Sequence, residues 1–121
     1  MVRLVKSAGF VADVENALRV SEENWGRDGR ARYTLLVTHA LADLARDSHR
    51  LGVHELPERP GFFGYALRHS RNNMPAVQRV GQPRHVIYFR LTEDRDAVRL
   101  LRLLHDRMLP EPWLPPADEA P

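Results

Sequence analysis

Residues 84–108 have the sequence RHVIYFRLTEDRDAVRLLRLLHDRM, and they constrain the expected fold more than any other segment. The run at 84–91 is rich in β-branched and aromatic residues and predicts a β-strand. The polar residues 92–95 predict a turn. The run at 96–105 is rich in leucine and arginine, which also favour helices, but a strand one short turn upstream needs a neighbour to pair with. We therefore expect an antiparallel pair of strands here.

Alternation along residues 84–91 separates the two faces of the first of these strands. The face expected in the core carries His85, Ile87, Phe89 and Leu91. The opposite face, expected to be free and half exposed, carries Arg84, Val86, Tyr88 and Arg90. Residues 59–92 contain six arginines and no acidic residue. A rigid sheet with such a cationic surface is expected to meet an anionic partner.

The N-terminal residues predict a short strand followed by a helix. Residues 2–6 (VRLVK) alternate apolar and polar side chains, as a half-buried strand does. Ser7 is a suitable N-cap for a helix over residues 8–24. The apolar residues of that helix recur at helical spacing: Val11, Val14, Leu18 and Trp25.

Gly26 and Gly29 interrupt the helical pattern, and a second helix is expected over residues 30–50 with Gly52 as its C-cap. Its wider apolar face consists of Tyr33, Leu36, Val37, Ala40, Leu41 and Leu44. Because the connection is so short, the two helices should form an antiparallel αα-hairpin.

The middle of the chain is less regular. Pro57 and Pro60 predict an irregular connection that leads into a strand over residues 62–69. Residues 70–83 mix turn residues with a small apolar run, so they form either a long loop or a loop with a short strand near residues 76–80.

This order of elements predicts an α+β domain of two layers: an N-terminal strand and an αα-hairpin, then a three-stranded antiparallel sheet. The domain is expected to span residues 1–109. Residues 110–121 contain five prolines and are expected to form an extended C-terminal arm, in which Trp113 and Leu114 either pack back on the sheet or belong to the interface with a partner.

Composition excludes several classes of function. The 121-residue chain contains no cysteine, which excludes disulfides and thiolate catalysis and fits a reducing cytosol. No apolar run approaches the roughly 20 residues that span a bilayer, and Lys6 and Asp13 leave no room for a signal peptide. A cytoplasmic location is therefore expected. The six histidines are not spaced as metal ligands, so neither a metal nor another cofactor is expected. All but one of the 18 basic residues are arginine, which reflects either a GC-rich genome or an anionic partner.

Two strings near the C-terminus resemble the end of the ParE toxins of type II toxin–antitoxin systems. These are PRHVIYFRL and VRLLRLLHDRM, which match the family's R-H-x-I-x-Y-R and I-x-R-x-L-H-x-R-M strands. Upstream, ENWGRDGRARYTLLVTHALADLARDSHRLG is similar to the family's helical hairpin, and GFFGYALRHSR corresponds to its first sheet strand. The resemblance covers roughly residues 3–112. The chain departs from it by about a dozen extra residues between Ser70 and Gln82.

The resemblance implies a bacterial toxin with a RelE/ParE-like fold that inhibits DNA gyrase by binding it. A ParD-like antitoxin would wrap around the toxin and neutralise it in a hetero-oligomer, with an amphipathic helix in a groove along the helical hairpin. The residues expected to contact the antitoxin or the target are Trp25, Tyr33, Leu36, Arg68, Arg84, Arg90, Arg99, Arg102, His105, Arg107, Met108 and Trp113. An inactive relative that only binds its antitoxin is a further alternative.

The same superfamily includes RelE-like ribonucleases that cut messenger RNA on the ribosome, so fold alone does not decide the function. In that alternative the catalytic residues would be Arg68, Arg84, His105 and Arg107. Against it, the lysines of the RelE-like sites are missing, and Trp113 stands about where their C-terminal tyrosine would fall. An indole has no proton that titrates near neutral pH, whereas His105 has an imidazole that can.

Overall fold

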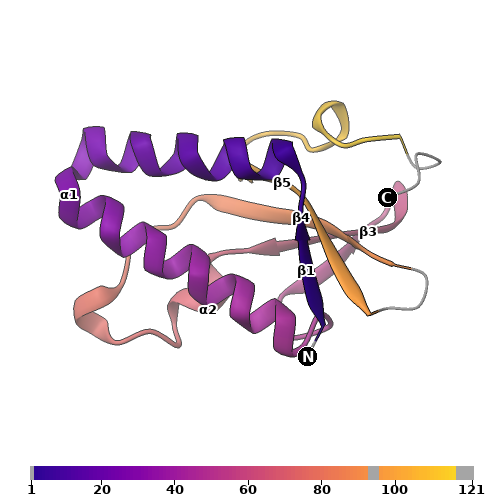
Figure 1. Ribbon diagram of the computed structural model, residues 1–121, viewed down its shortest axis with the longest axis horizontal. Helices are drawn as coiled ribbons and strands as arrows, with labels where there is room; N and C mark the ends of the chain where they lie inside the picture. Colours follow the sequence, from indigo (N-terminus) through magenta and orange to yellow (C-terminus); the bar gives the residue numbers. More distant parts are fainter. Residues whose placement is uncertain (1, 93–95, 117–121) are drawn as a thin grey trace.

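A computed structural model of the chain describes residues 2–92 and 96–116. The chain forms an α+β domain, as expected from the order of its elements (Figure 1). The elements are, in chain order, β1 (Arg3–Lys6), α1 (Ala8–Arg46), β2 (Val53–Leu56), β3 (Arg59–Ala66), α2 (Arg68–Arg71), β4 (His85–Leu91) and β5 (Ala97–His105). Short 3-10 turns lie at Ala76–Gln78 and Glu111–Trp113. Within the described residues, no helix is both long and apolar enough to cross a membrane.

The sheet has five strands in the order β1-β5-β4-β3-β2, not the three expected from the sequence. The central strands β3, β4 and β5 are antiparallel neighbours as predicted, whereas β1 lies parallel to β5 and makes the sheet mixed. The backbone N–H of Arg3 donates to the carbonyl of Asp96 (3.0 Å), and that of Ser7 to the carbonyl of Leu100 (3.0 Å). This pairing joins segments more than 90 residues apart, which alternation within one segment cannot reveal.

Strand β2 was not expected, because Pro57 and Pro60 suggested an irregular connection. Residues 57 and 58 instead form the tight turn of a β2–β3 hairpin. Pro60 and Gly61 lie where the register shifts, so the missing N–H of the proline disrupts no regular ladder. Gly61 has φ +88°, and its backbone N–H donates to the carboxylate of Glu55 (2.8 Å). A bulge thus explains why β3 begins at residue 59 and not at 62.

The helical hairpin is formed by α1, which breaks sharply at Gly26 (φ +73°, ψ −172°) (Figure 1). Ser7 is the N-cap as predicted, since its hydroxyl accepts the N–H of Phe10 (3.0 Å). The second half ends at Arg46 and not at residue 50, because the Asp47 side chain accepts the N–H of His49 (3.0 Å) and so favours a local turn. Gly52 is therefore not the C-cap. It lies in the turn before β2 with φ +101°.

The main core lies between the hairpin and one face of the sheet. Its fully buried members include Phe10, Leu36, Leu44, Tyr65, Leu67, Ile87, Phe89, Val98 and Leu100. Ile87 and Phe89 therefore face the core as expected. Two residues of the expected helical stripe do not, since Val11 and Trp25 are 53% and 73% exposed.

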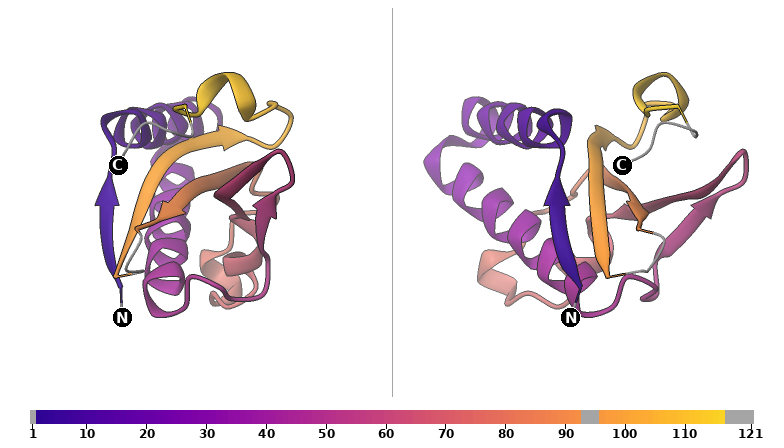
Figure 2. Two further views of the ribbon diagram at one scale, coloured as in Figure 1. Left: turned by 90° about the vertical axis from the view of Figure 1, so that its right-hand side faces the viewer. Right: turned by 45° about the vertical axis from the view of Figure 1, so that its right-hand side comes forward.

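The opposite face of the sheet is not free, contrary to expectation. It holds a second, smaller cluster of buried side chains: Leu56, Phe62, Ala66, Val86, Tyr88, Leu104 and Leu114. Leu114 comes from the C-terminal residues, which form a 3-10 turn at 111–113 and fold back beside β5 (Figure 2). Residues 110–116 therefore do not extend away from the domain as an arm.

The segment after β3 also differs from expectation. Residues 68–71 form the short helix α2 and not the end of a strand, because Ser70 is fully buried and its hydroxyl donates to Asp43 of α1 (2.7 Å). The following loop contains a 3-10 turn at 76–78 where a short strand was one of two alternatives. The predicted turn at 92–95 lies mostly outside the described residues.

Candidate functional site

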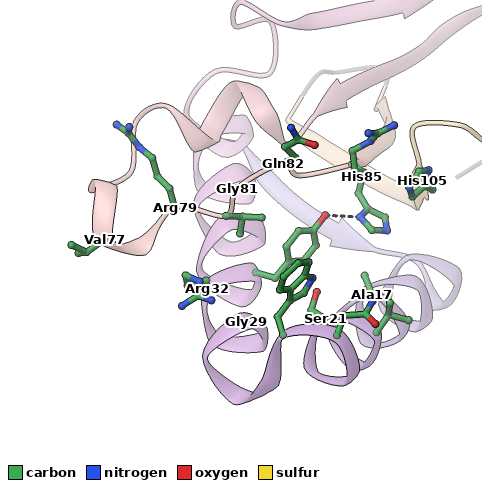
Figure 3. A pocket seen from close by; sticks show the side chains of 16 residues that line it. Ala17, Ser21, Gly29, Arg32, Val77, Arg79, Gly81, Gln82, His85 and His105 are labelled. Carbon is green, nitrogen blue, oxygen red and sulfur yellow. Dashed lines mark hydrogen bonds between the residues drawn. The ribbon is translucent and has the colours of Figure 1, made fainter.

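A groove of about 810 Å³ lies where the hairpin turn, the loop at residues 77–82 and the ends of β4 and β5 meet. Figure 3 shows the side chains that line it. Of the described residues around it, three are arginine and two are histidine, and none is acidic: Arg32, Arg79, Arg84, His85 and His105. At its rim Trp25 is 73% exposed and Val77 87% exposed. The groove thus combines positive charge with exposed apolar surface.

Tyr33 and His85 both line the groove and are joined by a hydrogen bond, which is the dashed line in Figure 3. The phenol oxygen of Tyr33 lies 2.5 Å from Nδ1 of His85. Burial raises the pKa of Tyr33 well above its ordinary value, the backbone N–H of Arg84 acts in the opposite direction, and the charge of Asp106 adds to the rise. Burial, followed by the nearby charge of His105, lowers the pKa of His85 to about 4. Both groups are therefore neutral near pH 7, and the phenol donates its hydrogen to the imidazole.

His105 connects this pair to the edge of the groove. Its ring is perpendicular to that of His85 at a centroid distance of 5.7 Å. Nδ1 of His105 accepts the backbone N–H of Arg107 (3.2 Å) when the ring is neutral, and it lies 3.2 Å from a carboxylate oxygen of Asp106. His105 thus lies between a backbone N–H donor and a carboxylate at the end of β5.

Arg84 is held by Asp106 next to this histidine. Nε of Arg84 donates to Oδ2 of Asp106 (2.9 Å), and this hydrogen bond lowers the pKa of Asp106 below its usual range. Arg84 and Asp106 also line a second hollow, which Arg68 borders from α2. The structure thus brings three residues of the ribonuclease hypothesis, Arg68, Arg84 and His105, to one end of the sheet, and Arg107 follows Asp106 directly.

The other expected contact residues lie elsewhere. Leu36 is fully buried in the main core, so it cannot touch a partner in this fold. The remaining ones lie along β4, β5 and the residues that follow: Arg90, Arg99, Arg102, Met108 and Trp113. Arg102 is tied to Asp13 of α1 through Nε (2.6 Å) and Nη2 (2.9 Å), and Met108 packs against the second cluster. The expected contact residues are thus divided between the groove and the opposite side of the sheet.

The sequence did not identify the full lining of the groove. His85 was assigned to the core, and Arg32, Arg79 and Gln82 were not singled out. His85 and Tyr33 are 52 residues apart, and each lies on an element whose local pattern shows only burial. The one usable signal was the R-H pair at the start of β4, where a polar residue occupies a core position.

The described part of the chain contains no cluster of three or more histidine, cysteine or acidic side chains arranged to hold a metal ion. The comparisons with known proteins add no assignment: no protein-family model matches the chain, and no curated protein is similar to it.

Proposed function

We propose that the chain is a ParE-like toxin of a type II toxin–antitoxin system, which inhibits DNA gyrase by binding and is neutralised by a ParD-like antitoxin. The observation that carries the proposal is the groove, whose described lining has basic and apolar residues and no carboxylate, while the neighbouring Asp106 is paired with Arg84. Such a surface suits an acidic macromolecular partner. The finer fold assignment, RelE/ParE-like, is part of the same proposal and is supported by the paired helices packed on antiparallel central strands.

The electrostatics of the groove favour binding over catalysis. A general acid or base works best when its pKa lies near the operating pH. Tyr33 keeps its proton well above neutral pH, and His85 takes one up only near pH 4. Arg84 is already paired with Asp106, so phosphate would have to compete with a carboxylate for that guanidinium. These groups are therefore better suited to rigid recognition than to proton transfer.

A ribosome-dependent endoribonuclease is the second candidate, and one observation favours it. His105 lies beside Asp106, which holds Arg84, so an imidazole is close to a guanidinium that could hold a phosphate. In this alternative His105 would move the proton, while Arg68, Arg84 and Arg107 would stabilise the charged intermediate.

The two candidates are separated by testing the purified chain in parallel. One reaction contains gyrase and supercoiled plasmid, and the other contains translating ribosomes with a reporter message. We expect linear DNA to accumulate after protein denaturation in the first reaction and no codon-linked cuts in the second. Message cuts without DNA cleavage would reject the gyrase proposal in favour of the ribonuclease. If neither reaction responds but the product of an adjoining gene binds the chain, both activities are rejected and only antitoxin binding remains.

A further inference from the structure

The side of the sheet opposite the main core is covered by the chain's own C-terminal residues. We call residues 110–116 the tail segment, and the surface formed by Leu56, Phe62, Val86, Tyr88 and Leu104 the outer face. The tail segment folds back beside β5 (Figure 2). Leu114 is its only side chain within the buried cluster of the outer face, where it is 8% exposed.

Two arginines hold the tail segment by its polar groups. Nη1 of Arg59 donates to the Glu111 carboxylate (2.7 Å), and Nη2 of the same residue donates to the carbonyl of Pro115. Nη1 of Arg102 donates to the carbonyl of Trp113 (3.3 Å), and the guanidinium lies 5.5 Å from the centre of the Trp113 ring. The outer face therefore recognises a carboxylate, two backbone carbonyls and one aliphatic side chain, which is how a peptide-binding surface recognises an extended peptide.

The tail segment fills this surface incompletely. Arg59 is 11% exposed, and its Nε–H is buried without a hydrogen-bond acceptor among the described residues. Trp113 remains 45% exposed although it contacts Arg102. A buried donor without an acceptor is unfavourable, so a ligand that offers one more acceptor would fit the face better.

We propose that the outer face is a binding surface for an acidic, extended segment of a partner protein, and that the tail segment occupies this surface in cis until the partner segment displaces it. The positive charge of Arg59 selects a carboxylate-bearing segment, Arg102 holds its backbone, and the apolar cluster selects a large aliphatic residue three positions further on, as Glu111 and Leu114 are spaced. The proposal is independent of gyrase inhibition and of the groove.

The test uses a variant of the 121-residue chain in which the tail segment is released from the outer face. Leu114→Asp places a charge in the apolar cluster and should release the tail, whereas Leu109→Asp makes the same change at a residue that is 78% exposed. A Trp25→Phe background leaves Trp113 as the sole indole. We expect acrylamide to quench Trp113 more strongly in the Leu114→Asp variant than in the parent chain, and the Leu109→Asp control to behave like the parent.

The probe is a fluorescein-labelled peptide with the sequence of residues 109–121, LPEPWLPPADEAP. We expect the Leu114→Asp chain to bind it at least about tenfold more tightly than the parent, because the tail no longer competes. Adding Arg59→Gln to that chain, or replacing the first glutamate of the peptide (Glu111) by lysine, should abolish the gain. Neither assay includes gyrase or a ribosome, so failure here is distinct from failure of the proposed function.

Four results would overturn the proposal. The first is equal binding of the peptide to the parent and the Leu114→Asp chain. The second is a folded Leu114→Asp chain with released Trp113 that binds no peptide. Loss of the far-UV circular dichroism spectrum in that variant is the third, because the tail would then be a fixed part of the core. The fourth is sedimentation of the parent as a dimer that the peptide converts to monomer, since the occupant would then be a second copy of this chain.

Discussion

Asp43 illustrates how a single buried charge organises the fold. It is 1% exposed and contacts Arg46, Arg50 (2.9 Å) and the hydroxyl of Ser70 (2.7 Å), which in turn lies 2.7 Å from the Tyr65 hydroxyl. Burial alone would raise the pKa of Asp43, but the Ser70 hydrogen bond and the charges of Arg50 and His39 outweigh it, so the pKa is lowered. This carboxylate joins α1 to α2 and places the loop that borders the groove.

We expect Asp43→Ala to lower the free energy of unfolding by about 3 kcal/mol, because it removes the carboxylate partner of the half-buried Arg50 and one of the two hydrogen bonds of the buried Ser70 hydroxyl. Urea unfolding followed by circular dichroism measures the change. The matched control is Glu23→Ala, which removes the exposed partner of Arg19 (2.8 Å) and should cost no more than about 0.5 kcal/mol. Equal costs in the two variants would contradict the role assigned to Asp43.

The Tyr33–His85 contact gives a pH dependence with a defined sign. In the unfolded chain His85 takes up a proton near pH 6.5, but in the folded chain only near pH 4. The stabilisation that comes from keeping His85 neutral is therefore complete above pH 6.5 and is lost as the pH falls toward 4, a change of roughly 3 kcal/mol at 1.36 kcal/mol per unit.

His85→Gln should remove this part of the pH dependence. Urea unfolding of both chains at intervals from pH 7 to pH 4 tests the prediction. We expect the unfolding free energy of the parent to fall more steeply over that range than that of the variant. Identical slopes would show that His85 is not kept neutral by burial.

At the level of secondary structure, the sequence predicts the elements whose local pattern and packing agree. Strands β4 and β5 begin and end within one residue of the predicted bounds, because each has a full run of apolar residues. The Ser7 cap and the break at Gly26 were also predicted, since both depend on local backbone chemistry. The elements that were missed depend on distant partners. Strand β2 is visible only through its pairing with β3, and α2 only through the bond between Ser70 and Asp43.

The candidate site was predicted less completely than the fold, for the same reason. Trp25, Tyr33, Arg84 and His105 do line one groove, but Leu36 points into the core. The position of a residue along a helix predicts which face of the helix it lies on. It does not predict how completely the neighbouring layer buries that residue. The outer face was expected to be free because proline-rich segments are commonly extended. The proline-rich tail segment instead folds back, and its Leu114 is buried against the outer face.

A substitution of Gly26 tests whether the break in α1 depends on the backbone conformation of glycine. Its backbone (φ +73°, ψ −172°) lies in a region that residues with a Cβ rarely adopt. No described atom lies within 4 Å of the position of an added Cβ, so the cost of Gly26→Ala is one of backbone strain. We expect a loss of about 1–3 kcal/mol in thermal or urea unfolding. Gly81→Ala, which also has open space but no positive φ, should be neutral or slightly stabilising.

For the molecule as a whole, the two sides of the sheet have separate roles. One side supports the hairpin and, at its end, the basic groove with the exposed indole of Trp25. The other is closed by the tail segment. If the groove docks an acidic partner, that indole should contribute strongly to binding, because large exposed aromatic residues are frequent hot spots of interfaces.

Trp25→Ala should therefore weaken binding of the antitoxin about tenfold or more, without loss of stability, since the side chain is 73% exposed. Titration calorimetry with the product of the adjoining gene measures the affinity. Leu51→Ala, at a residue that is 93% exposed and does not line the groove, is the control and should leave the affinity unchanged. Similar affinities for both variants would place the interface elsewhere.

The central claim is that the chain acts by binding gyrase and transfers no proton. The most direct test compares the yield of gyrase-cleaved DNA obtained with the His105→Ala variant and with the parent chain. His105 is the remaining imidazole of the groove, and a ribonuclease of this kind would need it as an acid or base. We expect the parent to trap cleaved DNA and the variant to lose less than about tenfold of that yield, because only one contact is removed. No trapped DNA with the parent would contradict the gyrase proposal, and a loss of about a thousandfold in a folded variant would show that His105 transfers a proton and does not merely provide one contact.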